Sequence, residues 1–200
     1  MDFSEIQQKI YSIDWSKYGT AYGNASGIEP VRNFSLKEKI KSFFVFNEYS
    51  AYKIRQRGHK VDVAKCLTDL FSENTQTQIE ATRELDNALC HQHVMISDAA
   101  APAYEFIILR FKQLQPDEEA MTEELFDILR GFTICTAKVN LSEPDSEWVK
   151  ELRSKLKRDV NLFEKYSSHH NEIVSEFSRE ICEILRDDNI APEKIDNLVG

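Results

Sequence analysis

Apolar residues recur at intervals of three and four positions along most of this chain, which is the spacing that gathers them on one face of an α-helix. One series with this spacing comprises Ala81, Leu85, Ala88 and Leu89. Only six glycines and five prolines interrupt the pattern in 200 residues. Because the apolar positions follow the helical period rather than the alternation of a strand, the sequence predicts an all-α fold.

The same spacing predicts about eight helices joined by short polar turns. We expect them after Ser35, over residues 50–70, up to residue 92, over residues 97–114, around residues 125–132, 142–152 and 174–185, and after Pro192. Short connections favour antiparallel neighbours, and a helix pair occupies roughly 40 residues in HEAT-like repeats. We therefore expect one domain, residues 1–200, in which residues 31–200 form helix hairpins stacked as a HEAT-like α-solenoid.

Residues 1–30 differ from the rest, since they combine three glycines with Trp15, Tyr18 and Tyr22. We expect an N-terminal helix followed by an ordered aromatic loop. A terminal element of a solenoid must cover the core that the first repeat would otherwise expose. We interpret this segment as such a cap, and a ligand site between the aromatic rings is the alternative.

A cysteine and two histidines, Cys90, His91 and His93, lie close together in the sequence and raise the question of a metal or thiol site. On a helix the two imidazoles would point about 200° apart, and the sequence places no third and fourth ligand nearby. We expect instead that a helix ends here and that the next begins with Ser97 as its N-cap and Asp98 in its first turn. The sequence thus predicts no metal ligand, no cofactor-binding residue and no catalytic residue.

Two further patterns bear on enzymatic function. The four cysteines lie far apart within helical segments, which is typical of buried, reduced thiols. The chain contains no glycine-rich phosphate loop and none of the H-E-x-x-H, G-x-S-x-G or C-x-x-C motifs. We therefore predict a protein that is not an enzyme.

Charge is the main indication of a partner. The chain has 25 basic and 34 acidic residues and a net charge of −9. Acidic side chains concentrate in one segment, whose members are Asp117, Glu118, Glu119, Glu123, Glu124 and Asp127. This segment is either a solvated helix face or a docking patch for a basic protein surface, and we predict partner binding there. If so, charge reversal at its glutamates should weaken binding and leave folding intact.

Other features restrict the partner and the compartment. Basic residues are interleaved with aromatic ones over residues 37–60, but the chain as a whole is acidic, so we expect nucleic acid not to be the partner. No apolar run reaches the roughly 20 residues of a bilayer span, and no secretory signal is visible at the start. We therefore expect a cytoplasmic protein without a membrane partner.

Two segments also resemble a known group of proteins. The first comprises Tyr18, Gly19, Thr20, Ala21, Tyr22 and Gly23, and the second the dipeptide His91-Gln92 followed by the small residues 99–103 around Pro102. Together they resemble bacterial HEAT-like helical-repeat proteins, several of which look like immunity proteins encoded beside polymorphic toxins. The resemblance covers residues 14–114, and residues 115–200 match nothing in the group.

The resemblance implies a function: neutralisation of a cognate bacterial toxin by direct binding. Two alternatives remain open. The chain could be a small all-helical enzyme or nucleic-acid processing factor, or it could be a housekeeping scaffold or adaptor, since one fold of this kind serves many partners.

Overall fold

The computed structural model describes residues 2–27, 61–91, 93–137 and 146–187, and this part of the chain is mostly helical, as the sequence predicted. Its α-helices are α1 (Phe3–Ser12), α4 (Val63–Asp69), α5 (Thr75–Leu89), α6 (Ala100–Phe111), α7 (Glu119–Cys135), α8 (Glu147–Arg158), α9 (Val160–Glu164) and α10 (Glu172–Arg186). The helices predicted after Ser35 and after Pro192 lie outside the described residues.

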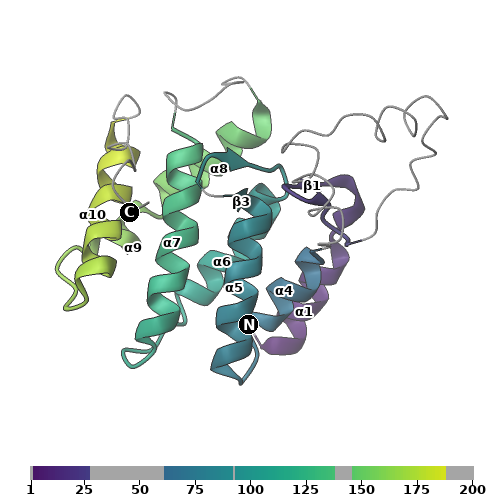
Figure 1. Cartoon of the computed structure of the whole chain (residues 1–200), viewed down its shortest axis with the longest axis horizontal. Coiled ribbons are helices and arrows are strands. Elements are labelled where there is room, and N and C mark those ends of the chain that lie inside the picture. The colour runs from purple at the N-terminus through teal and green to yellow at the C-terminus, as the bar shows by residue number, and fades with distance from the viewer. Residues whose placement is uncertain (1, 28–60, 92, 138–145, 188–200) are drawn as a thin grey trace, which may run out of the picture.

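The helices are arranged in two groups. Figure 1 shows α5, α7 and α10 side by side, and α7 packs against both of the others. Behind them α4 contacts α6, and α6 contacts α8. Helix α1 packs on α4. One apolar core runs between the two groups, and its fully buried side chains include Leu67, Leu85, Ile107, Phe126 and Phe163.

Side chains at the helix starts explain several boundaries. Asn74 accepts a hydrogen bond from the N–H of Thr77 at the start of α5, and Asn171 caps α10 in the same way. Asp62 accepts from the N–H of Lys65, so α4 begins at Val63. In its described part, residues 61–70, the predicted helix over residues 50–70 is confirmed over Val63–Asp69, but residues 61 and 62 are not helical because Asp62 caps the start of α4.

Two short antiparallel hairpins were missed by the sequence analysis. Strands β1 (Gly19–Thr20) and β2 (Gly23–Asn24) form the first, and β3 (Cys90–His91) and β4 (Met95–Ile96) form the second. Two-residue strands are too short to give an alternating pattern. The expected helix up to residue 92 accordingly ends at Leu89, and the chain turns back through the second hairpin.

The start of α6 also differs from the prediction. Ser97 is not its N-cap, because the Ser97 hydroxyl lies against the last carbonyls of α5, 3.3 Å from that of Leu89. Asp98 is not in the first helical turn, since α6 starts at Ala100 and the Asp98 carboxylate accepts the backbone N–H of Gly19 at 2.6 Å. This bond joins the first hairpin to the segment between the second hairpin and α6, across 79 residues of sequence. The three alanines at residues 99–101 are buried, as small residues at a close helix contact should be.

The N-terminal segment is anchored by its tryptophan. Trp15 is buried and its indole N–H donates to the carbonyl of Ile10 at 2.9 Å, which fixes the 3-10 turn η1 (Trp15–Lys17) against the end of α1. Tyr18 and Tyr22 are partly buried against the same core. Among the described helices, none combines the length and apolar composition needed to cross a bilayer.

Candidate binding groove

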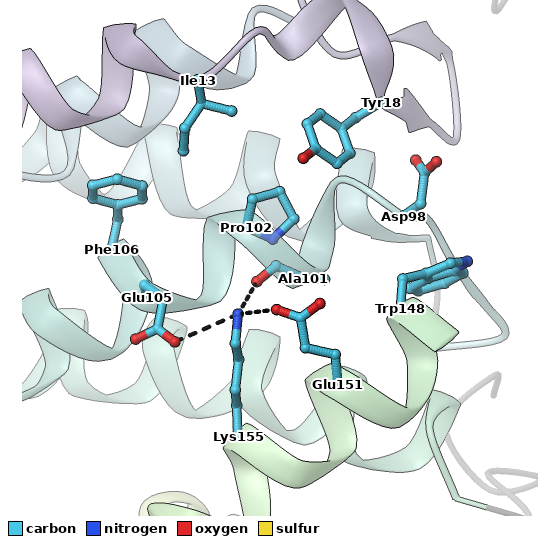
Figure 2. Close-up of a pocket in the computed structure, with 10 residues that line it drawn as sticks. All are labelled: Ile13, Tyr18, Asp98, Ala101, Pro102, Glu105, Phe106, Trp148, Glu151 and Lys155. Carbon is cyan, nitrogen blue, oxygen red and sulfur yellow. Dashed lines mark hydrogen bonds and ion pairs between the residues drawn. The ribbon is translucent and has the colours of Figure 1, made fainter. Parts of the chain in front are cut away.

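An open groove of about 300 Å3 lies over α6, between the N-terminal segment and α8 (Figure 2). Its floor consists of α6 residues, its upper wall of Ile13 and Tyr18, and its lower wall of α8 residues. The lining residues are Ile13, Tyr18, Asp98, Ala101, Pro102, Glu105, Phe106, Trp148, Glu151 and Lys155. Residues 13–18 and 148–155 are far apart in the sequence, so only the tertiary fold, which places the segment after α1 and helix α8 on either side of α6, creates this groove.

The helical period explains which side chains line the groove. Trp148, Glu151 and Lys155 are three and four positions apart, so they share one face of α8. On α6 the small residues Ala101 and Pro102 leave the space that a larger side chain would fill. Pro102 is tolerated here because the first turn of a helix has N–H groups without intrahelical partners.

Acidic groups outnumber basic ones in the groove. Its lining contains three carboxylates, those of Asp98, Glu105 and Glu151, and one ammonium, that of Lys155. The Lys155 ammonium is already engaged, since it donates to the Ala101 carbonyl at 3.1 Å and lies 2.8 Å from Glu151 and 3.5 Å from Glu105 (Figure 2). The groove therefore combines three aromatic rings, those of Tyr18, Phe106 and Trp148, with an excess of negative charge.

The acidic segment predicted to bind a partner lies at the start of α7 and on its first turns. Four of its six carboxylates face basic groups of this chain. Glu118 pairs with Arg110, Glu119 with His170 and Glu124 with Arg83, and Asp127 lies 3.6 Å from His93. Partner binding by Asp117, Glu118, Glu119, Glu123, Glu124 and Asp127 stays a prediction, and these internal pairs reduce the charge that the segment offers to a partner. Residues 37–60, the basic aromatic stretch, lie outside the described residues.

Glu118 differs from its neighbours because its partner is in the core. Arg110 is 5% exposed, and its guanidinium also donates to the Leu70 carbonyl and the Gln78 amide oxygen. Burial alone would raise the pKa of the Glu118 carboxyl, but hydrogen bonds from Arg110 and from the N–H of Gln115 outweigh it, and the pKa is lowered. The structure therefore leads us to expect that charge reversal at Glu118 destabilises the fold, whereas the sequence alone led us to expect intact folding.

The segment from Cys90 to His93 does not converge on one point. The Cys90 thiol is buried 3.4 Å from that of Cys135, and His91 lies 3.2 Å from the Tyr22 hydroxyl through its Nδ1. His93 instead faces two carboxylates that the sequence analysis did not connect with it, those of Asp86 on α5 and Asp127 on α7. Burial raises the pKa of the Asp127 carboxyl, and the nearby Asp86 adds to the shift.

No pattern in the sequence predicts that Asp86, His93 and Asp127 lie together. His93 reaches the carboxylates because its backbone adopts the left-handed conformation, with φ at +53°. That dihedral is a consequence of the hairpin between α5 and α6, and the sequence analysis expected a helix end in its place. The helical faces of α5 and α7 could have suggested that Asp86 and Asp127 lie on neighbouring helices, but not that an imidazole lies between them.

The thiols have the environment of structural cysteines. Cys90, Cys135 and Cys182 are buried and Cys66 is partly buried, and all four are free thiols. Burial raises the pKa of Cys66 to about 12, and a hydrogen bond between the Cys90 and Cys135 thiols together with burial raises the pKa of Cys90. Because the thiolate is the reactive form, these two groups are poor nucleophiles at neutral pH.

Comparisons with protein-family models, with curated proteins and with solved structures gave no significant match, so the resemblance to immunity proteins stays a prediction from the sequence.

Proposed function

We propose that this chain is a protein-binding member of the HEAT-like class, that it neutralises a cognate toxin by direct contact, and that the groove over α6 receives a basic side chain of that partner. The observation on which the proposal depends is the groove itself, in which Tyr18 and Trp148 accompany an excess of carboxylates.

The helix arrangement supports the solenoid part of the proposal. Helices α4 and α5 contact each other, as do α6 and α7, and α10 contacts α8 and α9. The second helices of these successive pairs, α5, α7 and α10, lie side by side (Figure 1). Stacked helix pairs of this kind contact only their neighbours and present extended surfaces for other proteins.

The chemistry of the groove supports a cationic ligand group. An arginine or lysine side chain inserted between the rings of Tyr18 and Trp148 would gain about 0.5–2 kcal/mol from each favourable cation–π contact. The carboxylates of Glu105 and Glu151 already bind the Lys155 ammonium, so a cationic ligand group would share them with Lys155. The net charge of −9 would also raise the association rate of a basic protein.

The first experiment identifies the partner and its activity. The tagged chain is used to recover proteins from its native cell at moderate salt, and the recovered protein is then expressed with and without the chain. The proposal expects a protein that stops growth alone and is tolerated together with the chain. A recovered protein that has no effect on growth would favour the scaffold alternative.

The second experiment tests the groove with purified partner. Trp148→Ala and Glu151→Gln should each weaken binding by about 1–2 kcal/mol, or about 5- to 30-fold, if the groove holds a basic side chain. Glu176→Gln is the matched control, because Glu176 is exposed on α10, away from the groove. Circular dichroism confirms that each variant is folded. Affinities equal to the wild type in both groove variants would remove the groove from the interface.

A third variant separates the groove from the acidic segment. Asp117→Lys combined with Glu123→Lys changes the segment while leaving the internal pairs of Glu118, Glu119 and Glu124 in place. Loss of affinity in this variant alone would place the partner on the start of α7, as the sequence predicted. Loss in the groove variants alone would place it over α6.

A further inference from the structure

We infer that Asp86, His93 and Asp127 form a binding site for one divalent cation of the zinc or manganese type. His93 Nε2 lies 3.7 Å from Asp86 Oδ1 and 3.6 Å from Asp127 Oδ1. The three atoms all lie within 4.8 Å of one another. The inference is independent of the proposed toxin binding, and it departs from the sequence-based expectation of no metal ligand.

The separations suit a cation after a small rotation of the carboxylates. Ligands in a tetrahedral zinc site, with bonds of about 2.0–2.2 Å, lie about 3.3–3.5 Å apart. The measured distances between His93 and the two carboxylates exceed this by only a few tenths of an ångström. Two carboxylate oxygens and one imidazole nitrogen are a mixed set that suits Zn2+ and Mn2+, and three protein ligands leave a position for water.

An unpaired atom points to the same site. Asp86 Oδ1 is buried, and within the described ranges it is the one buried side-chain nitrogen or oxygen that lacks a hydrogen-bond partner. Its distance of 3.7 Å from His93 is too long for a hydrogen bond. Leaving a buried carboxylate oxygen without a partner costs free energy, and a bound cation removes that cost.

Two local features hold the imidazole in place. The left-handed backbone at His93 is uncommon for a residue with a side chain and costs free energy. Gly131, inside α7, provides the space for the ring, since a Cβ there would lie 2.6 Å from His93 Cδ2 and 3.0 Å from Nε2. A glycine inside a helix costs about 1 kcal/mol relative to alanine. The chain therefore bears two local costs that leave the ring facing both carboxylates.

Arg130 limits the affinity of this site. Its Nη1 lies 3.3 Å from His93 Nδ1, and the guanidinium also binds Glu180 through two hydrogen bonds, at 2.5 and 3.2 Å. Since a guanidinium can only donate, Nδ1 accepts in this contact and the proton of the neutral ring is on Nε2. When Nε2 binds a cation, that proton must move to Nδ1, where it faces a donor. Cation binding must therefore break the contact and leave Arg130 with Glu180 alone.

The contact between Arg130 and His93 therefore gives a test that distinguishes this site from nonspecific cation binding by acidic side chains. In Arg130→Gln the amide oxygen can accept the Nδ1–H of a metal-bound His93, as outer-shell partners of metal ligands do. The variant should therefore bind the cation more tightly than the wild type, by up to the roughly 10- to 100-fold that an outer-shell partner contributes. Arg83→Gln is the matched control, because Arg83 pairs with Glu124 on the same two helices and does not contact His93.

The experiment titrates Zn2+, and separately Mn2+, into the full chain after removal of metals with a chelator. Calorimetry gives stoichiometry and affinity, and the absorption spectrum with Co2+ reports coordination by nitrogen and oxygen. We expect one cation per chain, a loss of about 10-fold or more in both Asp127→Asn and His93→Gln, tighter binding in Arg130→Gln, and no change in Arg83→Gln. Two ligand variants are used so that, if one of them does not fold by circular dichroism, the other still tests the site. Absence of stoichiometric binding by the wild type, or equal affinity in the folded ligand variants, would overturn the inference.

Discussion

Loss of the Glu118 carboxylate should destabilise the protein, because it is the only acidic partner that the structure gives to the core guanidinium of Arg110 within the described residues. Arg110 is 5% exposed, and the Glu118 side chain is 23% exposed. Breaking a buried ion pair by removing one partner costs about 3–5 kcal/mol, since the other charge stays buried. Solvent reaches Glu118 in part, so we expect about 2–4 kcal/mol for Glu118→Gln and more for Glu118→Lys.

The assay is urea unfolding followed by circular dichroism at neutral pH. A loss of 2–4 kcal/mol is a large part of the total stability of about 5–15 kcal/mol that is usual for a folded domain. Glu119→Gln is the matched control: Glu119 is 54% exposed and its partner His170 is 65% exposed, so that surface pair should contribute no more than about 1 kcal/mol. Equal free energies of unfolding for the two variants would refute the argument that burial of Arg110 makes Glu118 structural.

The same pair has a defined pH dependence. The pKa of the Glu118 carboxyl is lowered from its ordinary value of 4.5, because the hydrogen bonds from Arg110 and Gln115 outweigh the opposing effect of burial. A lowered pKa in the folded state gives stability that is present above the unfolded pKa and is lost as pH falls through the folded pKa. The difference between wild type and Glu118→Gln should therefore be full at pH 6 and shrink below about pH 4. A difference that stays constant down to pH 3 would contradict this assignment.

Three further variants or measurements test other parts of the structure. Gly131→Ala should lower the free energy of unfolding by about 1–2 kcal/mol in a urea titration, since contact with the His93 ring outweighs the gain in helix propensity, and a more stable variant would contradict the position of that ring. The thiols should react slowly with a disulfide reagent at pH 8 in the folded chain and rapidly in urea, because burial raises the pKa of Cys66 to about 12; fast labelling without urea would show that they are accessible. Tyr104→Phe should cost about 1–2 kcal/mol in thermal unfolding, because the buried Tyr104 hydroxyl donates to Asp159 at 3.1 Å, and an unchanged melting temperature would mean that this bond contributes nothing.

Helix periodicity predicted the described elements well where the pattern was long. Residues 81–89 and 174–185 lie within α5 and α10, and their apolar positions face the core. The predictions failed at helix boundaries, because single capping side chains or hairpins determine where a helix begins or ends. Asp62 starts α4 later than expected, and the second hairpin replaces a helix end near His91.

The candidate sites were much less predictable. The six acidic residues form a group in the sequence, but in the structure four of them face four different basic residues. These basic residues are Arg83 on α5, Arg110 on α6, His93 between β3 and β4, and His170 just before α10. The groove and the Asp86–His93–Asp127 cluster each combine residues from three separate parts of the chain. Residues brought together in this way have no regular spacing in the sequence, so sequence patterns do not predict these sites.

The sequence by itself determined that this chain forms amphipathic helices and which of their faces are buried, because the helical period and the hydrophobic effect act over a few neighbouring residues. It also determined the net negative charge that any partner meets. Only the tertiary structure decided that the segment after α1 and helix α8 border one groove on α6, and that His93 lies between Asp86 and Asp127. These depend on which helices pack together and on one positive φ angle, and both are set by contacts between residues distant in the sequence.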